Sequence, residues 1–224
     1  AIFLQDHKIP RGTRANVATK QAEKCRLLLI MNHGKIDNRQ VTHGGTAIIM
    51  PFDQIELKKG ENLRQAINRI KKSKKTLPHG RAVAVSAIIN GKKRRLVATY
   101  APVTGSVAER IGFFTTLGRF ITPHTYLGID ANATPDPALD RKGAPPDAKP
   151  NAVERELNRI IDETGLIDVA RRFLGNRPFF TSHHIGAGGA ESWTRIDQIY
   201  TPDDPNEFWT HSPDNKDFFP TKKD

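Results

Sequence analysis

The sequence predicts a single α/β domain in which helices cover β-sheets. Short apolar segments of strand-like composition alternate along the chain with segments that repeat apolar residues at helical spacing. The 224 residues, of which 37% are hydrophobic, are enough to bury one sizeable core. No internal repeat with a fixed period interrupts this alternation, so we expect one domain over residues 1–224.

The first half of the chain is expected to form strands, one helix and a hairpin. The first strands are short apolar runs at residues 1–5, 26–31 and 46–50. Residues 61–75 repeat apolar side chains at helical spacing and carry a basic opposite face, which predicts an amphipathic helix. Two β-rich runs, residues 81–89 and 95–100, flank Asn90-Gly91, a dipeptide typical of a two-residue hairpin turn.

The second half alternates helices and strands around a proline-rich loop. Five prolines between residues 135 and 150 indicate that loop. Residues 151–163 form an amphipathic pattern, and Gly165 is a natural stop for the helix that the pattern predicts. The other expected elements are a helix at residues 107–121 and strands at residues 126–130, 179–183 and 193–200.

The charge balance favours a polyanionic partner. Lysine and arginine number 35 against 24 aspartate and glutamate residues, which gives a formal net charge of +11. Each phosphate that a basic surface neutralises releases counterions, so nucleic acid is a candidate partner. A dense basic run makes Lys71, Lys72, Lys74 and Lys75 candidate nucleic-acid-binding residues. A charged surface that serves solubility alone is the competing interpretation.

The composition also excludes several classes of protein. No apolar stretch approaches the roughly 18 residues of a membrane-spanning helix. The first residues are too short for a signal peptide and lack its basic start. Cys25 is the single cysteine, so an internal disulfide framework and a multi-cysteine zinc site are excluded. These features fit an intracellular protein in a reducing compartment, with no membrane partner.

Polar side chains stand at the ends of several expected strands. They are Asp6, Tyr100, Asp130, Asn132, Arg195 and Asp197. Arg195 and Asp197 alternate within residues 193–200, so both are expected to face one side of that strand. Taken singly, each has an ordinary structural explanation, such as a capping aspartate or an ion pair. Together they indicate a site, because functional loops converge at strand ends in α/β folds.

This set of side chains suits metal-assisted hydrolysis of a phosphodiester. Carboxylate and amide oxygens without a cysteine cluster favour Mg²⁺ or Mn²⁺ over zinc. A hard cation polarises a phosphoryl oxygen and stabilises the leaving alkoxide, while a carboxylate or amide positions the attacking water. A metal-dependent phosphodiesterase is therefore the predicted chemistry.

Seven short motifs follow one another in an order that matches a known family. They are residues 2–6 (IFLQD), 44–49 (GGTAII), 97–102 (VATYAP), 128–132 (GIDAN), 165–169 (GLIDV), 180–181 (FT) and 194–197 (TRID). In this order the chain resembles the endonuclease/exonuclease/phosphatase superfamily, and within it the apurinic-like endonuclease domains of LINE-type retrotransposons. Each motif alone is weak, so their order over nearly the whole chain carries the resemblance.

The resemblance implies a four-layer α/β sandwich with two facing mixed β-sheets, and Mg²⁺-dependent cleavage of DNA, or of RNA, in the nucleus. Asp6 would hold the metal, and Tyr100 would contact the scissile phosphate. Asp130 would position or activate water, with Asn132 as its partner. Asp197 would orient the catalytic histidine of the family. Arg195 would brace its strand, and it is also a candidate nucleic-acid-binding residue.

Three departures from the family pattern lower the activity expected of this chain. The chain begins just before Gln5, so the first strand of the family is not in it. No Ser-Asp-His motif follows Asp197, and residues 211–214 (HSPD) have the wrong order. Asp6 is one methylene shorter than the glutamate of the family. Loss of the histidine alone costs on the order of 100-fold, so we expect weak activity or none.

Two other functions are compatible with the sequence. A degenerate nucleic-acid-binding remnant would keep the basic charge and lose catalysis. A phosphatase of the same superfamily would act on a phospholipid or an inositol phosphate, which are also anionic. Salt-dependent DNA binding without cleavage would identify the first, and phosphate release without strand scission the second.

Overall fold

A computed structural model describes residues 1–36, 42–186 and 189–204. The first elements are β1 (Ile2–Gln5), α1 (Thr13–Lys24), β2 (Leu27–Asn32), β3 (Lys35–Ile36), β4 (Thr42–His43), β5 (Thr46–Pro51), α2 (Leu63–Lys72), β6 (Lys75–Leu77), β7 (Ala82–Ile89) and β8 (Lys92–Tyr100). They are followed by α3 (Val107–Gly118), β9 (Thr125–Asp130), α4 (Pro137–Asp140), α5 (Ala152–Thr164), β10 (Leu166–Asp168), α6 (Val169–Leu174), β11 (Ser182–Ile185), β12 (Glu191–Thr194) and β13 (Asp197–Pro202). Short 3₁₀ turns lie at Phe52–Gln54 and Pro78–Gly80.

Two β-sheets form the centre of the molecule. The small sheet has the order β1-β5-β2 and the large sheet the order β10-β13-β9-β8-β7-β6. Only the large sheet is mixed, because β8 and β9 run parallel while its other neighbouring strands are antiparallel. The small sheet is wholly antiparallel, since β5 runs opposite to both of its neighbours. The expectation of two mixed sheets is therefore wrong for the small sheet.

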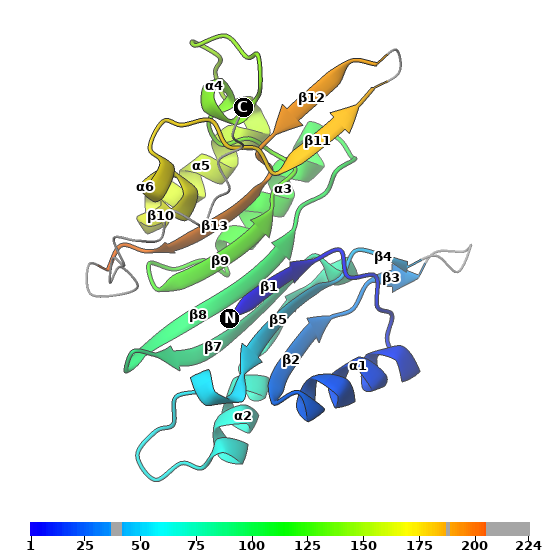
Figure 1. Ribbon diagram of the computed structural model, residues 1–224, viewed down its shortest axis with the longest axis vertical. Coiled ribbons are helices and arrows are strands. Elements are labelled where there is room, and N and C mark those ends of the chain that lie inside the picture. The colour runs from blue at the N-terminus through cyan, green and yellow to red at the C-terminus, as the bar shows by residue number, and fades with distance from the viewer. Residues whose placement is uncertain (37–41, 187–188, 205–224) are drawn as a thin grey trace, which may run out of the picture.

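The apolar residues divide the fold into four layers. One core lies between the two sheets and joins Ile30 and Ile48 of the small sheet to Val83 and Leu96 of the large sheet. A second core packs α3 and α5 against the outer face of the large sheet. A smaller cluster packs α1 against β2 and β5. The α/β fold and the predicted four-layer arrangement are confirmed (Figure 1).

Local sequence signals account for where the helices and the central hairpin end. Helices α2, α3 and α5 each begin with a capping box, in which the N-cap side chain and the third helical residue bond each other's backbone amides. Gly165 ends α5 in the left-handed conformation, as predicted. Asn90 and Gly91 both have positive φ angles, which joins β7 and β8 by the predicted two-residue turn.

Residues 193–200, predicted to form one strand, belong to two strands. β12 ends at Thr194, and β13 begins at Asp197 in a different sheet. The interruption falls on Arg195, which turns inward and is 1% exposed, while Asp197 is exposed at the start of β13. Arg195 and Asp197 therefore do not project from the same face of one strand. The burial of the Arg195 guanidinium interrupts the strand, so the expected alternation of side chains does not hold there.

Gly128 lets the two sheets approach each other closely. A Cβ atom at this position would lie 2.5 Å from Cβ and Cγ of Phe3 on β1. We expect Gly128→Ala to lower the free energy of unfolding by about 1–3 kcal/mol, the usual cost of overpacking. Gly112→Ala is the control, because a Cβ there meets nothing within 4 Å, and α3 should gain about 0.5–1 kcal/mol. Urea unfolding of both variants measures the difference, and equal midpoints would contradict the close contact.

Candidate active site

Three predicted residues lie side by side at one end of the large sheet. Tyr100 on β8 is paired with Asp130 on β9, and Asp130 is paired with Asp197 on β13. Directly paired residues on neighbouring strands project from the same face of a sheet. The strand ends therefore place one phenol and two carboxylates in a single row.

The row faces the small sheet and the residue that follows β1. Gly128 lies two positions before Asp130, on the same face, and that face packs against Phe3. β1 ends beside the row, so Asp6 is delivered to the same end of the molecule (Figure 1). The structure thus brings together Asp6, Tyr100, Asp130 and Asp197, which are distant in the sequence.

Asp6 is held by the Gly-Gly segment that precedes β5. The backbone N–H of Gly44 donates to the Asp6 carboxylate at 3.0 Å, and Nζ of Lys8 lies 3.4 Å from its other oxygen. Asp6 has a φ angle of 49°, a strained value for a residue with a side chain. Glycine is required at position 45, because φ is +108° and a Cβ would lie 2.6 Å from the His7 ring.

The electrostatics of the cluster centre on Asp130. Burial, followed by the nearby carboxylates of Asp197 and Asp6, raises the pKa of its carboxyl to about 6. The N–H of Asn132 donates to Oδ1 of Asp130 at 3.1 Å, and this hydrogen bond lowers the pKa of Asp130. A carboxyl that titrates close to neutral pH can accept a proton from water, as general-base catalysis requires.

The pKa of Asp130 predicts a pH dependence of both stability and any hydrolysis. The folded pKa of about 6 lies above the reference value of 3.8, so this group contributes stability that is full below pH 3.8 and is lost as pH rises through 6. Hydrolysis that needs ionised Asp130 should rise about tenfold per pH unit up to the pKa of the cation-bound enzyme, which the cation's charge would hold below 6, and level off above that pKa. Carbon-detected NMR titration of the carboxyl checks the midpoint, and a midpoint near 4 would contradict the account.

Arg81 belongs to this site and was missed by sequence reasoning, which placed it only at the start of a strand. Its guanidinium carbon lies 5.1 Å from the centroid of the Tyr100 ring. Its Nη1 donates to the backbone carbonyls of Tyr100 and Ala101 at 3.4 and 3.2 Å. Arg81 also lowers the pKa of Asp130, whereas burial followed by the charges of Asp6 and Asp130 raises the pKa of Tyr100. Tyr100 is therefore a neutral hydrogen-bond donor beside a fixed cation.

Asn132 is locked in place next to Asp130. Its φ angle of 45° turns the chain sharply, and its Nδ2 donates to the carbonyl of Ala101 at 3.0 Å. Nη2 of Arg110 donates to the backbone carbonyl of Asn132 at 2.7 Å. Asparagine tolerates this left-handed conformation better than most residues. The turn after β9 therefore fixes the amide beside the carboxylate row.

Thr181 fixes the backbone that leads into Asp197. Its hydroxyl oxygen accepts hydrogen bonds from the N–H groups of Ile196 and Asp197 at 3.1 and 3.0 Å. The carbonyl of Ile196 in turn accepts from the N–H of Ala131 at 2.8 Å, which joins this segment to the turn after β9. The role of Thr181 is therefore to hold Asp197 in the row.

Arg195 lies in the interior of the protein, where its side chain is 1% exposed. Its guanidinium makes two hydrogen bonds to Asp140, at 2.8 and 3.0 Å, and lies 2.8 Å from a carboxylate oxygen of Asp168. Arg171 also contacts Asp140. Arg195 lies between β12 and β13 and in neither strand, so its ion pairs tie this connecting segment to Asp140 and Asp168. The prediction that Arg195 contacts nucleic acid is corrected, because the side chain is almost fully enclosed.

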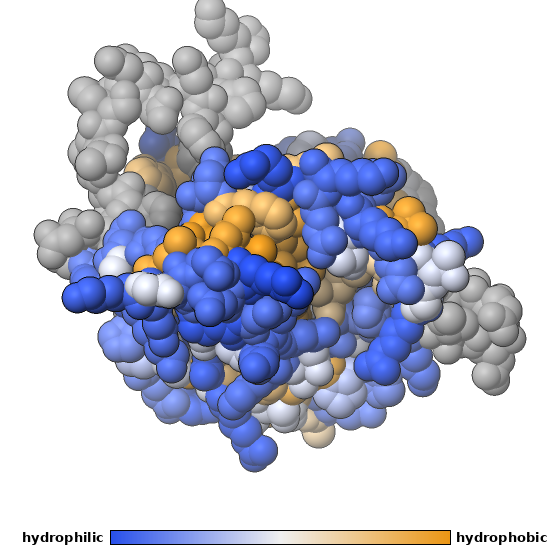
Figure 2. Space-filling view, turned by 90° about the horizontal axis from the view of Figure 1, so that it is seen from below, coloured by the Kyte–Doolittle hydropathy of each residue, from blue (hydrophilic) through white to orange (hydrophobic). Residues whose placement is uncertain are grey.

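The lysine run lies on the surface beside the small sheet. The apolar face of α2, with Ala66 and Ile70, is buried against the core. Lys71 and Lys72, at the end of the helix, are exposed. Lys71 lies 3.7 Å from Glu23 on α1. Figure 2 shows that hydrophilic side chains cover most of the face seen from below, around an apolar area.

Lys74 and Lys75 lie near the end of β2. Both are exposed, and the positive charges of Lys74 and Arg11 each lower the pKa of His33, after the larger effect of burial. Asn32, which precedes His33, donates to the carbonyl of Leu77 at 2.6 Å, so the ends of β2 and β6 lie together. Basic side chains from two segments, Lys74–Lys75 and Arg11, therefore lie around His33 at the exit of β2.

The side chains at the row have the oxygen donors that Mg²⁺ or Mn²⁺ prefers. The charges of Asp6 and Asp197 both oppose ionisation of Asp130, and a divalent cation would relieve this repulsion. Over the described ranges, no three His, Cys, Asp or Glu side chains form a group that could hold a metal ion. The carboxylates are of the type that such an ion prefers, and the rest of its ligands would be water or phosphate oxygens.

No protein-family model matches the sequence, and no curated protein matches it. Among solved structures, the chain is similar to the endonuclease domain of TRAS1, a telomere-specific non-LTR retrotransposon. The identity is 15%, the TM-score is 0.47, and the alignment covers 85% of this chain and 79% of that one. It is also similar to truncated Caenorhabditis elegans TDP2, with 13% identity, a TM-score of 0.43, and coverage of 88% and 69%. Because both scores are below 0.5, any function has to be argued from the site itself.

Proposed function

We propose that this chain is a metal-dependent phosphodiesterase domain of the DNA endonuclease type, with weak activity. The observation that carries the proposal is the row of Tyr100, Asp130 and Asp197, which faces Asp6. Burial, followed by the charge of Asp197, raises the pKa of Asp130 to about 6. A carboxyl poised near neutral pH beside a phenol and a guanidinium is the arrangement that attack of water on a phosphodiester requires.

Each side chain then has a defined task. Asp130 orients the attacking water and accepts its proton, with the Asn132 amide beside it. The Tyr100 hydroxyl donates a hydrogen bond to a phosphate oxygen, and the Arg81 guanidinium neutralises developing negative charge. Asp6 would hold the cation, with Asp130 and Asp197 close to it. A bound Mg²⁺ would polarise the phosphoryl oxygen and stabilise the leaving alkoxide.

The proposed substrate is DNA, with RNA as the competing nucleic acid. The net charge of +11 and the basic side chains at Lys74, Lys75 and Arg11 would follow a phosphate backbone away from the row. A retrotransposon source and a nuclear site of action rest on the order of the sequence motifs. Within the described residues, no helix is long and apolar enough to cross a membrane.

Nicking of supercoiled plasmid is the test of this function. We expect slow conversion to the open circular form with Mg²⁺ and none with EDTA. EDTA-insensitive nicking would contradict a metal-dependent site. DNA binding without any nicking would favour the degenerate remnant, and phosphate release from inositol phosphates without scission would favour the phosphatase. Residues 211–214, considered above as a substitute for the missing histidine motif, lie outside the described residues.

The basic side chains near the site predict how binding responds to salt. We expect Lys74→Gln with Lys75→Gln to weaken DNA binding severalfold at moderate salt and to reduce the slope of log K against log salt by about 1–2. Lys58→Gln with Lys59→Gln is the matched control, since both lysines are exposed and lie before α2. Fluorescence anisotropy at several salt concentrations measures the slopes, and equal slopes for the two double variants would contradict this assignment.

A further inference from the structure

The turn that follows β9 holds Asn132 in an unfavourable backbone conformation. Its φ angle of 45° lies in the left-handed region, which a residue with a Cβ keeps only where its surroundings fix it. On one side, the N–H of Ala131 donates to the carbonyl of Ile196 at 2.8 Å. On the other, Nε2 of Gln198 donates to the carbonyl of Ala133 at 3.2 Å. Contacts with other segments therefore impose the shape of this turn.

Arg110 supplies the contact that holds the backbone of Asn132 itself. Its Nη2 donates to the carbonyl of Asn132 at 2.7 Å. A hydrogen bond from a charged donor is roughly twice as strong as one between neutral groups. The Arg110 side chain is half-buried, and its Nε is enclosed without a hydrogen-bond partner among the described residues. A cation that is partly withdrawn from water thus fixes the carbonyl of Asn132.

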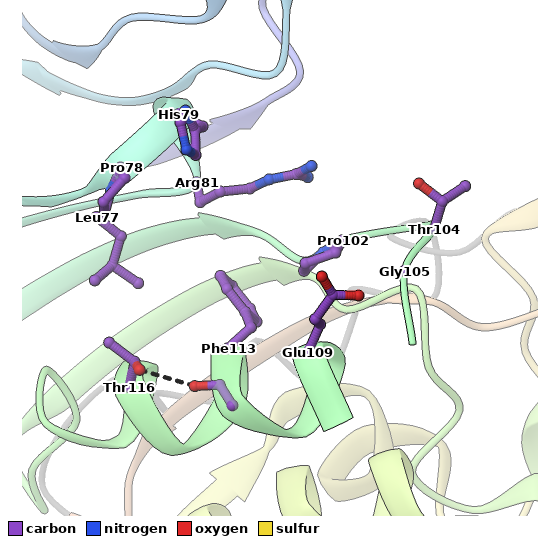
Figure 3. A pocket seen from close by; sticks show the side chains of 11 residues that line it. Leu77, Pro78, His79, Arg81, Pro102, Thr104, Gly105, Glu109, Phe113 and Thr116 are labelled. Atoms are coloured by element: carbon purple, nitrogen blue, oxygen red, sulfur yellow. Dashed lines mark hydrogen bonds between the residues drawn. The ribbon is translucent and has the colours of Figure 1, made fainter. Parts of the chain in front are cut away.

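Helix α3 brings Arg110 to this turn. Glu109, in the first turn of α3, lies beside Pro102 at the exit of β8, and both line one open groove (Figure 3). The helix begins at Ser106 with a capping box, and the N–H of Arg110 donates to the carbonyl of Ser106 at 3.1 Å. The helix also packs against α5. Arg110 therefore projects from a rigid element, as precise positioning requires.

Two further hydrogen bonds connect Asn132 to the candidate active site. Its backbone N–H donates to Oδ1 of Asp130 at 3.1 Å, and its Nδ2 donates to the carbonyl of Ala101 at 3.0 Å. The same carbonyl accepts from Nη1 of Arg81 at 3.2 Å. A change in the backbone angles of Asn132 would turn its N–H, its side chain and its carbonyl relative to one another. The bond from Arg110 and the bond to Asp130 are therefore expected to form together.

We propose that Arg110 is a positioning residue, which fixes the turn after β9 so that the Asn132 N–H stays on Asp130 and the Asn132 amide stays beside the carboxylate row. Arg110 acts through Asn132 and not on the substrate. The proposal rests on the proposed function, in which Asn132 stands beside the base that activates water. Because the chemical step is sensitive to displacements of about 1 Å, loss of Arg110 should slow that step and preserve DNA binding.

Hydrogen exchange of the Asn132 backbone amide, measured by NMR, tests the contact without requiring cleavage. In Arg110→Met, exchange should be at least ~10-fold faster than in the wild type, because the turn opens and frees the N–H from Asp130. Arg110→Lys should bring the rate to within about threefold of the wild type, since an ammonium can still donate to one carbonyl. Arg119→Met, an exposed arginine at the other end of α3, is the matched control and should leave exchange unchanged.

Single-turnover nicking of plasmid separates positioning from a purely structural role. With Mg²⁺, Arg110→Met should lower the maximal rate at saturating protein by about 10–100-fold and change the protein concentration for half-maximal rate by less than about threefold. Arg110→Lys should recover most of the maximal rate. A purely structural role would lower the urea midpoint of unfolding and leave the maximal rate of the folded variant unchanged.

The outcomes distinguish failure of this proposal from failure of the proposed function. Unchanged exchange in Arg110→Met would overturn the proposal, whatever the nicking rate. Faster exchange with an unchanged maximal nicking rate would also overturn it, because the turn would then not matter to the reaction. Faster exchange in Arg110→Met, with no Mg²⁺-dependent nicking by the wild type, would support the hold of Arg110 on Asn132 and overturn the proposed function instead.

Discussion

Asp130→Asn is expected to lower Mg²⁺-dependent nicking by about 100-fold or more, to the level of the EDTA control. Asparagine keeps the size of the side chain and removes the base that would accept the proton of water. In the wild type, the Asn132 N–H donates to Oδ1 of Asp130 at 3.1 Å. The side-chain oxygen of asparagine can accept the same hydrogen bond, so the local structure should be kept. Nicking rates of the wild-type chain and the variant, measured at pH 7.5 under the same conditions, give the ratio.

The same substitution should not harm the fold. Asp130 loses its stabilising contribution as pH rises through 6, so the neutral variant should be at least as stable as the wild type at pH 7.5. Asp53→Asn, an exposed aspartate in the turn after β5, is the control and should leave nicking unchanged. Unchanged nicking by a well-folded Asp130→Asn variant would remove Asp130 from the mechanism.

Arg195→Met is expected to lower the free energy of unfolding by about 3–5 kcal/mol, the largest stability effect that we predict for a single substitution. Arg195 is 1% exposed, and Asp140, which accepts two of its hydrogen bonds, is fully buried. Removal of the guanidinium leaves carboxylates uncompensated in the interior, although Arg171 still contacts Asp140. Denaturant unfolding followed by circular dichroism gives the free energy.

Arg119→Met is the matched control for this stability effect. Arg119 is exposed at the end of α3, so its replacement should change the free energy of unfolding by less than about 0.5 kcal/mol. If Arg195→Met also lowers the free energy of unfolding by less than about 0.5 kcal/mol, the buried ion pairs contribute little to stability. A functional effect is also expected, because Arg195 precedes the segment that carries Asp197 into the row.

The residues at the strand ends could be predicted from the sequence because strand ends have clear local signals. Leu127 and Ile129 form an apolar run that stops at Asp130, and the same holds for the run before Tyr100. That these positions pair across β8, β9 and β13 depends on register, which the sequence does not specify locally. The convergence of loops at strand ends in α/β folds, together with the order of the motifs, indicated that these strand ends would meet.

Residues whose role depends on tertiary contacts could not be predicted in the same way. Arg81 directly precedes β7, and nothing in its neighbourhood in the sequence indicates that it lies over Tyr100. Arg195 has the alternation of a strand residue, but its partner Asp140 is 55 positions away.

Binding of Mn²⁺ tests the central claim most directly, since it reports the cation site whether or not cleavage is fast. Low concentrations of Mn²⁺ should broaden the amide resonances of residues around Asp6, Tyr100, Asp130 and Asp197 first, and Asp130→Asn should weaken the effect severalfold. Mg²⁺ in excess should reverse it. Broadening that is centred elsewhere, or that is the same in the wild type and the Asp130→Asn variant, would contradict a metal-dependent phosphodiesterase site at these strand ends.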